Sequence, residues 1–399
     1  MALSVTLLMG INVQAQFWNG VSNTTSNIYR QGNVGVGYSS APVWCAPLEV
    51  NGDFNMRPSN SIMRINCVPV FHVTGANNLF VGDNAGQLNT GIQNTFLGYF
   101  SGSNNTTGQL NTFVGERSGV NNTTGSDNYI AGSSAGFFTT TSNDNVFIGK
   151  EAGYLHSNGD ENVMIGAENS FFSTDNSRTV NIGFQAGYNF FSNPGASGSS
   201  VQIGYRSGYD NGGGNNSVSV GYEAGKAAQP GANENVYIGY QAGLNNQGSG
   251  NATVGMLSGS NMTNAFDNVL MGYNTQVGPT SRSNTAVGSQ SFVTSGFDEG
   301  AVFGAGAQVT SGDQATALGY NTDVDGDNST AVGSNANVTG LKSTALGDNA
   351  SVNASFSTAI GYNSNACAAN TIVLGSDNGV QGNEVVMIGR CSSVNAVAG

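Results

Sequence analysis

A short motif built around a glycine recurs about twenty times from residue 78 to the end of the chain, and it limits the fold more than any other feature. Copies read NLFVGDNAG at 78–86, NTFLGYFSG at 94–102, NTFVGERSG at 111–119, NVYIGYQAG at 235–243 and STALGDNAS at 343–351. The glycine at the fifth place of each copy, called the central glycine below, recurs mostly every 16–18 residues as far as Gly288 and every 14 residues from Gly319 onward. Regular repeats of this length predict a solenoid, in which each unit buries its apolar side chains only by stacking on its neighbours.

Each unit is predicted to be a short strand followed by a bend. The residue directly before the central glycine is nearly always large and aliphatic, as in Ile238, whereas the residue two before it varies from Phe113 to Ala345. Neighbouring side chains of a strand point to opposite faces. We therefore expect the aliphatic residue to point into the coil and the varying residue to form an adjustable outer face. The glycine permits a bend or a close approach of two backbones.

Stacked units of this kind predict an all-β fold, a parallel β-roll or β-solenoid of about 20 short coils. At about 4.8 Å per coil, the rod would be roughly 90–100 Å long. Helix is disfavoured throughout, because glycine, asparagine and β-branched residues are poor helix formers. Identical residues should stack in ladders along the rod, with amides bonding to the neighbours above and below. One such ladder is predicted for Asn78, Asn94, Asn111, Asn128, Asn145 and Asn162.

The charge content limits the partners. Charged residues make up 9% of the 399 residues, against about 25% in ordinary domains, while 38% hydrophobic residues suffice for a core. The net charge of -13, from 24 acidic and 11 basic residues, argues against nucleic acid, which needs clustered lysine and arginine. It argues equally against anionic membrane surfaces. We expect a packed structure whose polar surface consists mainly of neutral groups.

The 14-residue units resemble a known family. The segments at 316–319, 329–333, 343–347 and 357–361 are similar to the head repeats of trimeric autotransporter adhesins, the YadA-like head. The resemblance is close over about 315–365 and looser over 78–314. It implies a left-handed parallel β-roll, a homotrimer with three chains side by side, display at the cell surface, and attachment to host matrix proteins, glycans, receptors or other cells. Similar units occur in phage tail fibres, so a tail-fibre shaft or receptor-binding part of a virion is the alternative.

Four regions are expected along the chain. Residues 1–16 form a possible signal segment, since 2–15 are apolar, too short to span a bilayer and end in a small-x-small pattern. A buried N-terminal strand is the alternative for this segment. Residues 17–76 are predicted to be an N-terminal β cap or attachment module, 77–314 a β-roll with 16–18-residue coils, and 315–399 a β-roll with 14-residue coils.

Motifs for catalysis or cofactor binding are not found, and we expect neither an enzyme nor a cofactor. GNVGVG at 32–37 is neither a dinucleotide-binding fingerprint nor a phosphate-binding loop. His72 and His156 have no motif partners and are predicted to lie at the surface or in the cap. The third alternative, a carbohydrate-active β-solenoid enzyme, would need clustered carboxylates in a polar cleft.

One acidic turn, DVDGDN at 323–328, is a weak candidate for calcium binding. Asp323, Asp325 and Asp327 offer the oxygen ligands that hard cations prefer. The spacing departs from that of an EF-hand loop, however. A solvated turn between two coils is therefore the favoured interpretation, and we assign no metal site.

Aromatic residues directly after the central glycine share one repeat position and should align in an interrupted stripe. Subunit packing or loop support is the first interpretation of such a stripe. A contact surface is the alternative, since tyrosine offers contact area and a hydroxyl group at low entropic cost. The candidate contact stripe, which also includes Phe184, consists of Tyr99, Tyr205, Tyr222, Tyr240, Tyr273, Tyr320 and Tyr362.

Self-association is predicted from the adjustable face. The residue two before the central glycine is large in early units, as in Phe96, and small in late ones, as in Ala331. A row of small residues would let a second chain approach closely, and an exposed row of phenylalanines would be a patch that monomers avoid.

The four cysteines show no metal-binding spacing. Cys367 and Cys391 are 24 residues apart, nearly two coils, so they are predicted not to pair with each other. The state of Cys45 and Cys67 stays open.

Overall fold

The computed structural model describes residues 61–65, 68–74, 77–189, 199–210, 216–227, 232–294 and 298–394, with side chains from residue 77 onward. The chain divides into two compact units, residues 1–57 and 58–399, and the second unit contains all the described residues. The expectations for residues 1–16, Cys45 and Cys67 lie outside the described residues.

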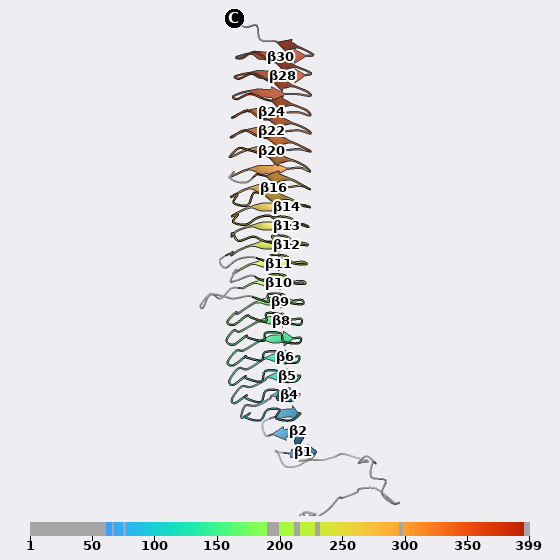
Figure 1. Ribbon diagram of the computed structural model, residues 1–399, viewed down its shortest axis with the longest axis vertical. Helices are drawn as coiled ribbons and strands as arrows, with labels where there is room; N and C mark the ends of the chain where they lie inside the picture. Colours follow the sequence, from blue (N-terminus) through green and yellow to red (C-terminus); the bar gives the residue numbers. More distant parts are fainter. Residues whose placement is uncertain are drawn as a thin grey trace, which may run out of the picture. The chain divides into compact units, whose positions relative to one another are not determined.

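The described part of the second unit is all-β, a column of stacked parallel strands (Figure 1). Its main sheet has 22 strands, of which β1 (Ser61–Ile65) and β2 (Val68–Thr74) form an antiparallel hairpin and the other 20 are parallel. Strand β2 pairs antiparallel with β3 (Asn78–Val81), so the hairpin covers the edge of the first coil. The predicted β-solenoid of about 20 short coils is confirmed. No helix in the described ranges is long and apolar enough to cross a membrane.

Each coil adds one strand to the main sheet, in register with the strand of the coil before it. After β3, the strands of the longer coils are β4 (Thr95–Leu97), β5 (Thr112–Val114), β6 (Tyr129–Ala131), β7 (Val146–Ile148), β8 (Val163–Ile165), β9 (Val180–Ile182), β10 (Val201–Ile203), β11 (Val218–Val220), β12 (Val236–Ile238), β13 (Ala252–Val254) and β14 (Val269–Met271). The sheet continues with β16 (Thr285–Val287), β18 (Ala301–Phe303), β20 (Thr316–Leu318), β22 (Thr330–Val332), β24 (Thr344–Leu346), β26 (Thr358–Ile360), β28 (Ile372–Ser376) and β30 (Val386–Arg390).

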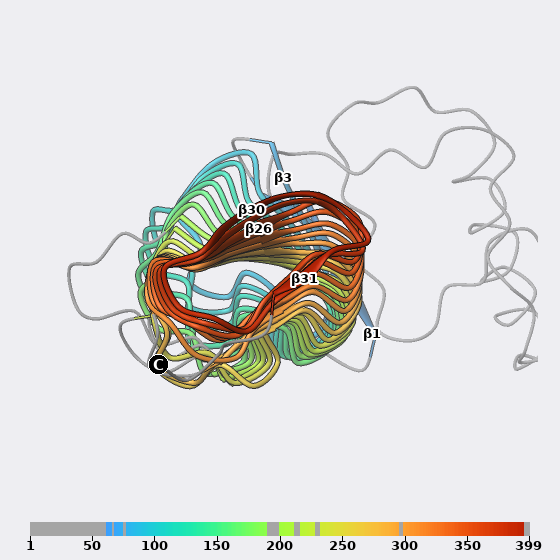
Figure 2. The same ribbon diagram turned by 90° about the horizontal axis from the view of Figure 1, so that it is seen from above.

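A second parallel sheet appears only in the later coils, where a short strand follows each central glycine from Gly272 onward. Its nine strands are β15 (Gln276–Val277), β17 (Phe292–Val293), β19 (Gln308–Val309), β21 (Asp323–Val324), β23 (Asn337–Val338), β25 (Ser351–Val352), β27 (Asn365–Ala366), β29 (Gly379–Val380) and β31 (Ser393–Val394). Seen down the column, β30 and β31 lie on opposite sides of the coil interior (Figure 2). The earlier coils have one described strand each and return through polar turns, so the column contains wide one-sheet coils and narrow two-sheet coils.

The inner and outer faces of the main sheet are the reverse of those expected. The residue two before each central glycine is buried, as in Phe113 and Ala345, whereas Ile238, directly before its glycine, is 41% exposed. The asparagine four before the glycine is also buried, as in Asn111. Because side chains alternate along a strand, residues four and two before the glycine share one face. The prediction that the aliphatic residue points into the coil is therefore wrong.

The buried residue two before the central glycine is an aromatic ring in several wide coils and alanine in several narrow ones. In the wide coils, Phe80 stacks on Phe96 and Phe96 on Phe113, with ring centroids 4.9 and 4.8 Å apart. In the narrow coils the second sheet fills the same space, and Ala317 shares one core with the fully buried Val324. The change from phenylalanine to alanine thus comes from the coil's own second sheet. It gives no support to the close approach of a second chain that we predicted from it.

The predicted asparagine ladder is confirmed. The peptide N–H of Asn111 donates to Oδ1 of Asn94 at 2.9 Å, and the side-chain amide of Asn128 donates to Oδ1 of Asn111 at 3.1 Å. The amide of Asn111 also donates to the carbonyl of Gly125, 2.8 Å away, which ties the strand to the end of its own coil. Each asparagine therefore joins neighbouring coils and closes one of them.

The central glycines mark the closest approach of the coils. Gly98 has a φ of +139°, and a Cβ atom built there would lie 2.3 Å from the carbonyl oxygen of Gly115 in the next coil. Any other residue would meet both a strained backbone and a backbone clash. The close approach expected from the sequence is therefore present.

Candidate functional site

The outer face of the main sheet is apolar along the column. We call the residues directly before the central glycines the outer row. Its exposed members include Ile148, Ile203, Ile238, Met271, Phe303, Leu318, Leu346, Ile360 and Ile388. The strands stack in register, so these side chains follow one another from coil to coil. Contiguous apolar surface of this length is typical of interaction sites.

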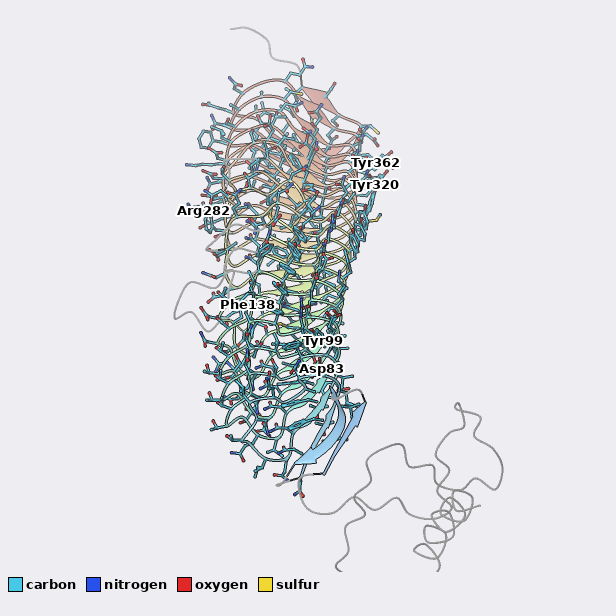
Figure 3. The ribbon with its side chains drawn as sticks, turned by 60° about the horizontal axis from the view of Figure 1, so that its bottom comes forward. Asp83, Tyr99, Phe138, Arg282, Tyr320 and Tyr362 are labelled. Carbon is cyan, nitrogen blue, oxygen red and sulfur yellow. The ribbon has the colours of Figure 1, made fainter. Side chains whose placement is uncertain are left out.

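The residues of the predicted contact stripe are all exposed, and we call them, with Phe184, the tyrosine row. The rings of Phe184, Tyr205, Tyr222 and Tyr240 form a continuous stack, with successive centroids 5.7, 4.9 and 5.1 Å apart. Tyr320 and Tyr362 lie together on one side of the column, and Phe138 lies on the other side in the same view (Figure 3). A role of the row in binding stays a prediction.

A second aromatic row was missed in the sequence. It consists of the residues five after the central glycines in five successive coils: Phe137, Tyr154, Phe171, Tyr188 and Tyr209. Successive centroids are 5.2, 4.8, 5.5 and 4.9 Å apart, and all these neighbours stack with nearly parallel planes. Phe138 and Phe172 pack edge-on against this row. The recurrence of an aromatic residue at one repeat position was the signal that could have revealed it.

Polar side chains two after the central glycines, called the polar row, lie between the two aromatic rows. The Gln185 amide donates to Glu168 at 2.7 Å, and Nε of Arg206 donates to Oε1 of Gln185 at 2.8 Å. The guanidinium of Arg206 lies 5.2 Å from the ring centroids of both Tyr205 and Tyr209. Since Tyr205 belongs to the tyrosine row and Tyr209 to the second aromatic row, Arg206 joins the two.

The polar row continues through Glu223, which is held as a carboxylate. Nζ of Lys226 donates to one oxygen at 2.6 Å, and the Gln241 amide donates to the other at 2.9 Å. Burial by itself raises the pKa of Glu223, but these hydrogen bonds outweigh it and the pKa lies below its ordinary value. Burial, together with nearby Tyr209 and Glu168, raises the pKa of Tyr188, so that its hydroxyl stays protonated.

The candidate calcium turn does not gather its carboxylates around one point. Asp323 accepts a hydrogen bond from Thr310 at 3.1 Å, and Asp325 accepts one from Ser311. Asp327 accepts the peptide N–H of Asp313 at 3.1 Å. Each aspartate therefore bonds to the preceding coil. Among the described residues, no group of three or more His, Cys, Asp or Glu side chains is placed to hold a metal ion.

His156 lies inside a wide coil, and its predicted place at the surface or in the cap is wrong. Its ring packs edge-on against Phe147, with centroids 5.2 Å apart, and Nε2 lies 3.0 Å from the carbonyl oxygen of Gly159. Asn105 and Asn122 occupy the same position in earlier coils and are also buried. Burial lowers the pKa of His156, so the ring is neutral near pH 7. The side chain of His72 lies outside the described residues.

Cys367 and Cys391 are free and exposed in the narrow coils. They occupy different positions of the repeat, six and two residues after a central glycine. The column therefore contains no bond between these two sulfur atoms.

The narrow coils match a known family. The family model described as the YadA head domain repeat matches residues 311–336, 339–364 and 354–378. Residues 311–378 form a YadA-like head. The resemblance seen in the sequence over 315–365 is thereby confirmed. The comparison with curated proteins finds no similar protein.

The YadA-like head is continuous with the wide coils. Strand β20, its first main-sheet strand, pairs in parallel with β18, and the same pairing continues through β16 and β14 to β13, the last strand of the wide coils. The outer row therefore runs without a change of register from the wide coils into the YadA-like head. Proteins with this head are typically structural surface adhesins, not enzymes, and generally form homotrimers.

Proposed function

We propose that this chain is the head of an extracellular, cell-surface adhesin, in which copies of the chain pack side by side and the remaining flanks attach to other surfaces. The observation that carries the proposal is the outer row, an apolar strip on the face of a sheet that no other part of the described chain covers. The YadA-like head at residues 311–378 supports both the location and the adhesive role.

The outer face is suited to burial against another copy. In the narrow coils its side chains are threonines and aliphatic residues, such as Thr344 and Leu346, and charged residues do not interrupt the strands β20 to β28. Burying apolar surface contributes about 25 cal/mol for each Å². Because the same face repeats on every coil, a parallel partner would gain the contact along the whole column. The number of chains, three, is taken from the YadA family.

We assign no catalytic step to the column. The buried carboxylate of the polar row, Glu223, accepts hydrogen bonds from Lys226 and Gln241, and its lowered pKa makes it a poor proton donor. Glu223 instead ties the side chains of Lys226 and Gln241 together at the surface. This structural role agrees with the character of YadA-type heads.

The assembly is tested by the mass of the purified protein in solution. Light scattering after size-exclusion chromatography should give about three times the chain mass of 40.8 kDa at micromolar concentration. Leu346→Arg should lower the mass, because Leu346 is 43% exposed in the outer row. Leu341→Arg is the matched control, since Leu341 is 47% exposed but lies in a turn outside the sheet. A stable single-chain mass for the unmodified protein would contradict the proposed assembly.

The adhesive role is tested with immobilised matrix proteins and glycans. The assembled protein should bind at least one class of these surfaces. Leu346→Arg should weaken this binding, because the separated chains no longer bind through several copies at once. An assembled protein that binds none of the matrix proteins, glycans or intact cells offered to it would remove attachment from the proposal.

A further inference from the structure

The two aromatic rows overlap and form one surface, which we call the aromatic band. Its nine rings are Phe137, Tyr154, Phe171, Tyr188 and Tyr209 of the second row and Phe184, Tyr205, Tyr222 and Tyr240 of the tyrosine row. The rows run side by side in the coils that begin at Gly183 and Gly204, where Arg206 lies between them. From the lower to the upper coils, the band thus shifts from the fifth residue after the central glycine to the residue directly after it.

We propose that the aromatic band binds a neutral, linear, β-linked polysaccharide that lies along the column axis. This inference rests on the proposed role as a surface adhesin and names the chemical class of one ligand.

The spacing favours a polymer with one contact group per coil. Tyr205, Tyr222 and Tyr240 repeat every 4.9 to 5.1 Å. One pyranose ring of an extended β-linked chain spans about the same length between its glycosidic oxygens, so successive sugars would meet successive coils. An extended polypeptide advances about 3.3 Å per residue, and a polyproline helix about 3.1 Å. Neither polypeptide form places one residue on each coil.

The groups that the band offers are ring edges and hydroxyls, not ring faces. The planes of Tyr188 and Tyr209 are inclined by only 2°, with centroids 4.9 Å apart, so each ring covers the face of its neighbour. A proline ring therefore finds no gap between two aromatic rings. The tyrosine hydroxyls both donate and accept hydrogen bonds, as sugar hydroxyls do. In the polar row beside them, Gln185 and Glu223 are only 8% exposed and are already hydrogen-bonded to neighbouring side chains, so they support the surface.

The charges beside the band nearly cancel. The three bases, Lys150, Arg206 and Lys226, stand among four acids, Glu151, Glu168, Asp210 and Glu223. Lys150 lies 3.6 Å from Glu151, and Lys226 lies 2.6 Å from Glu223. The band therefore has no positive excess to attract an acidic polymer, and the net charge of -13 on the chain repels such polymers. A neutral polymer is the class that this balance favours.

Calorimetric titration of the assembled full-length protein tests the inference. Cellohexaose and chitohexaose are the neutral probes, and a pectic hexamer of galacturonic acid and a hexaproline peptide are the controls for charge and for polyproline. At least one neutral hexamer should bind, with neither control binding comparably. Tyr222→Ala combined with Tyr209→Ala should weaken that binding about tenfold or more. Tyr320→Ala should not weaken it, because Tyr320 also follows a central glycine but lies outside the band.

Three results would overturn the inference: neither neutral hexamer binds, either control binds as well as the neutral hexamers, or Tyr320→Ala weakens binding as much as the double variant does. A change of mass on Tyr222→Ala would also overturn it, because the band would then be a contact between subunits. If the protein assembles and binds matrix proteins but binds neither neutral hexamer, this inference alone fails and the proposed function stands. Hexamer binding by a single-chain protein would leave the inference standing and remove the proposed assembly.

Discussion

Phe96 stacks on Phe113 inside the column, with ring centroids 4.8 Å apart and ring planes inclined by 10°. The two rings belong to successive strands, β4 and β5, and both are completely buried. This contact fixes which face of the main sheet forms the core, and it leads to the first prediction.

Phe113→Ala should lower the free energy of unfolding by about 3–5 kcal/mol, because it removes a buried ring and leaves a cavity between Phe96 and Ile130. Val114→Ala, one residue further along β5, should cost much less, since Val114 belongs to the outer row. Urea unfolding followed by circular dichroism measures both changes. Equal losses for the two variants would show that our assignment of the two faces is wrong.

Asn128 links three coils through its side chain. Its Oδ1 accepts the peptide N–H of Asn145, and its amide donates to the carbonyl of Ser142 at 2.7 Å. Asn128→Ala would leave these buried groups without partners, and we expect a loss of about 1–3 kcal/mol. Asn158→Ala is the control, because Asn158 is exposed and a change there should stay within about 0.5 kcal/mol. Exchange of backbone amide hydrogens should become faster around residue 128 in Asn128→Ala and should stay unchanged in Asn158→Ala. An equal increase in both variants would argue against the ladder as a source of stability.

The buried ring of His156 predicts a dependence of stability on pH. Burial lowers the pKa of His156 in the folded protein below 6.5, so below that pH the unfolded chain takes up a proton that the folded protein does not. Stability is therefore unaffected by this group above pH 6.5 and falls as the pH decreases below it, by at most about 1.4 kcal/mol per pH unit.

His156→Asn should remove this part of the pH dependence. Asparagine occupies the same position at Asn105 and Asn122, so the variant is expected to fold. Melting temperatures between pH 7.5 and 5.5 should fall more for the unmodified protein than for the variant. Identical pH profiles would mean that His156 takes up its proton in the folded protein as easily as in the unfolded chain.

Gln202 is a weak point of the core. It is buried in a wide coil, and neither polar atom of its side chain has a hydrogen-bond partner. Met164 occupies the equivalent position two coils earlier. Gln202→Met should therefore raise the free energy of unfolding by about 1–3 kcal/mol, because it removes two unsatisfied groups. Thermal unfolding measures the gain, and a lower melting temperature would show that the amide stabilises the coil.

The central glycines and the asparagine ladder were predictable because both depend on periodicity. A unit with so few apolar residues can bury them only against its neighbours, and equal residues at a fixed spacing then stack. The inner face could also have been predicted. Asn111 and Phe113 are two residues apart, so a ladder asparagine inside the coil places the phenylalanine inside as well. Alternation alone gives two faces and does not say which is inner.

The sequence by itself determined the stacked coils, their number and the rows of repeated residues. Only the tertiary structure decided which rows meet, because alternation of side chains applies to strands and ends at the turns. Arg206 and Gly208 have φ angles of 51° and 57°, and this left-handed backbone folds the chain back on itself. It brings Tyr205 and Tyr209, four residues apart, to either side of the Arg206 side chain. The aromatic band depends on that turn geometry, which no spacing in the sequence specifies.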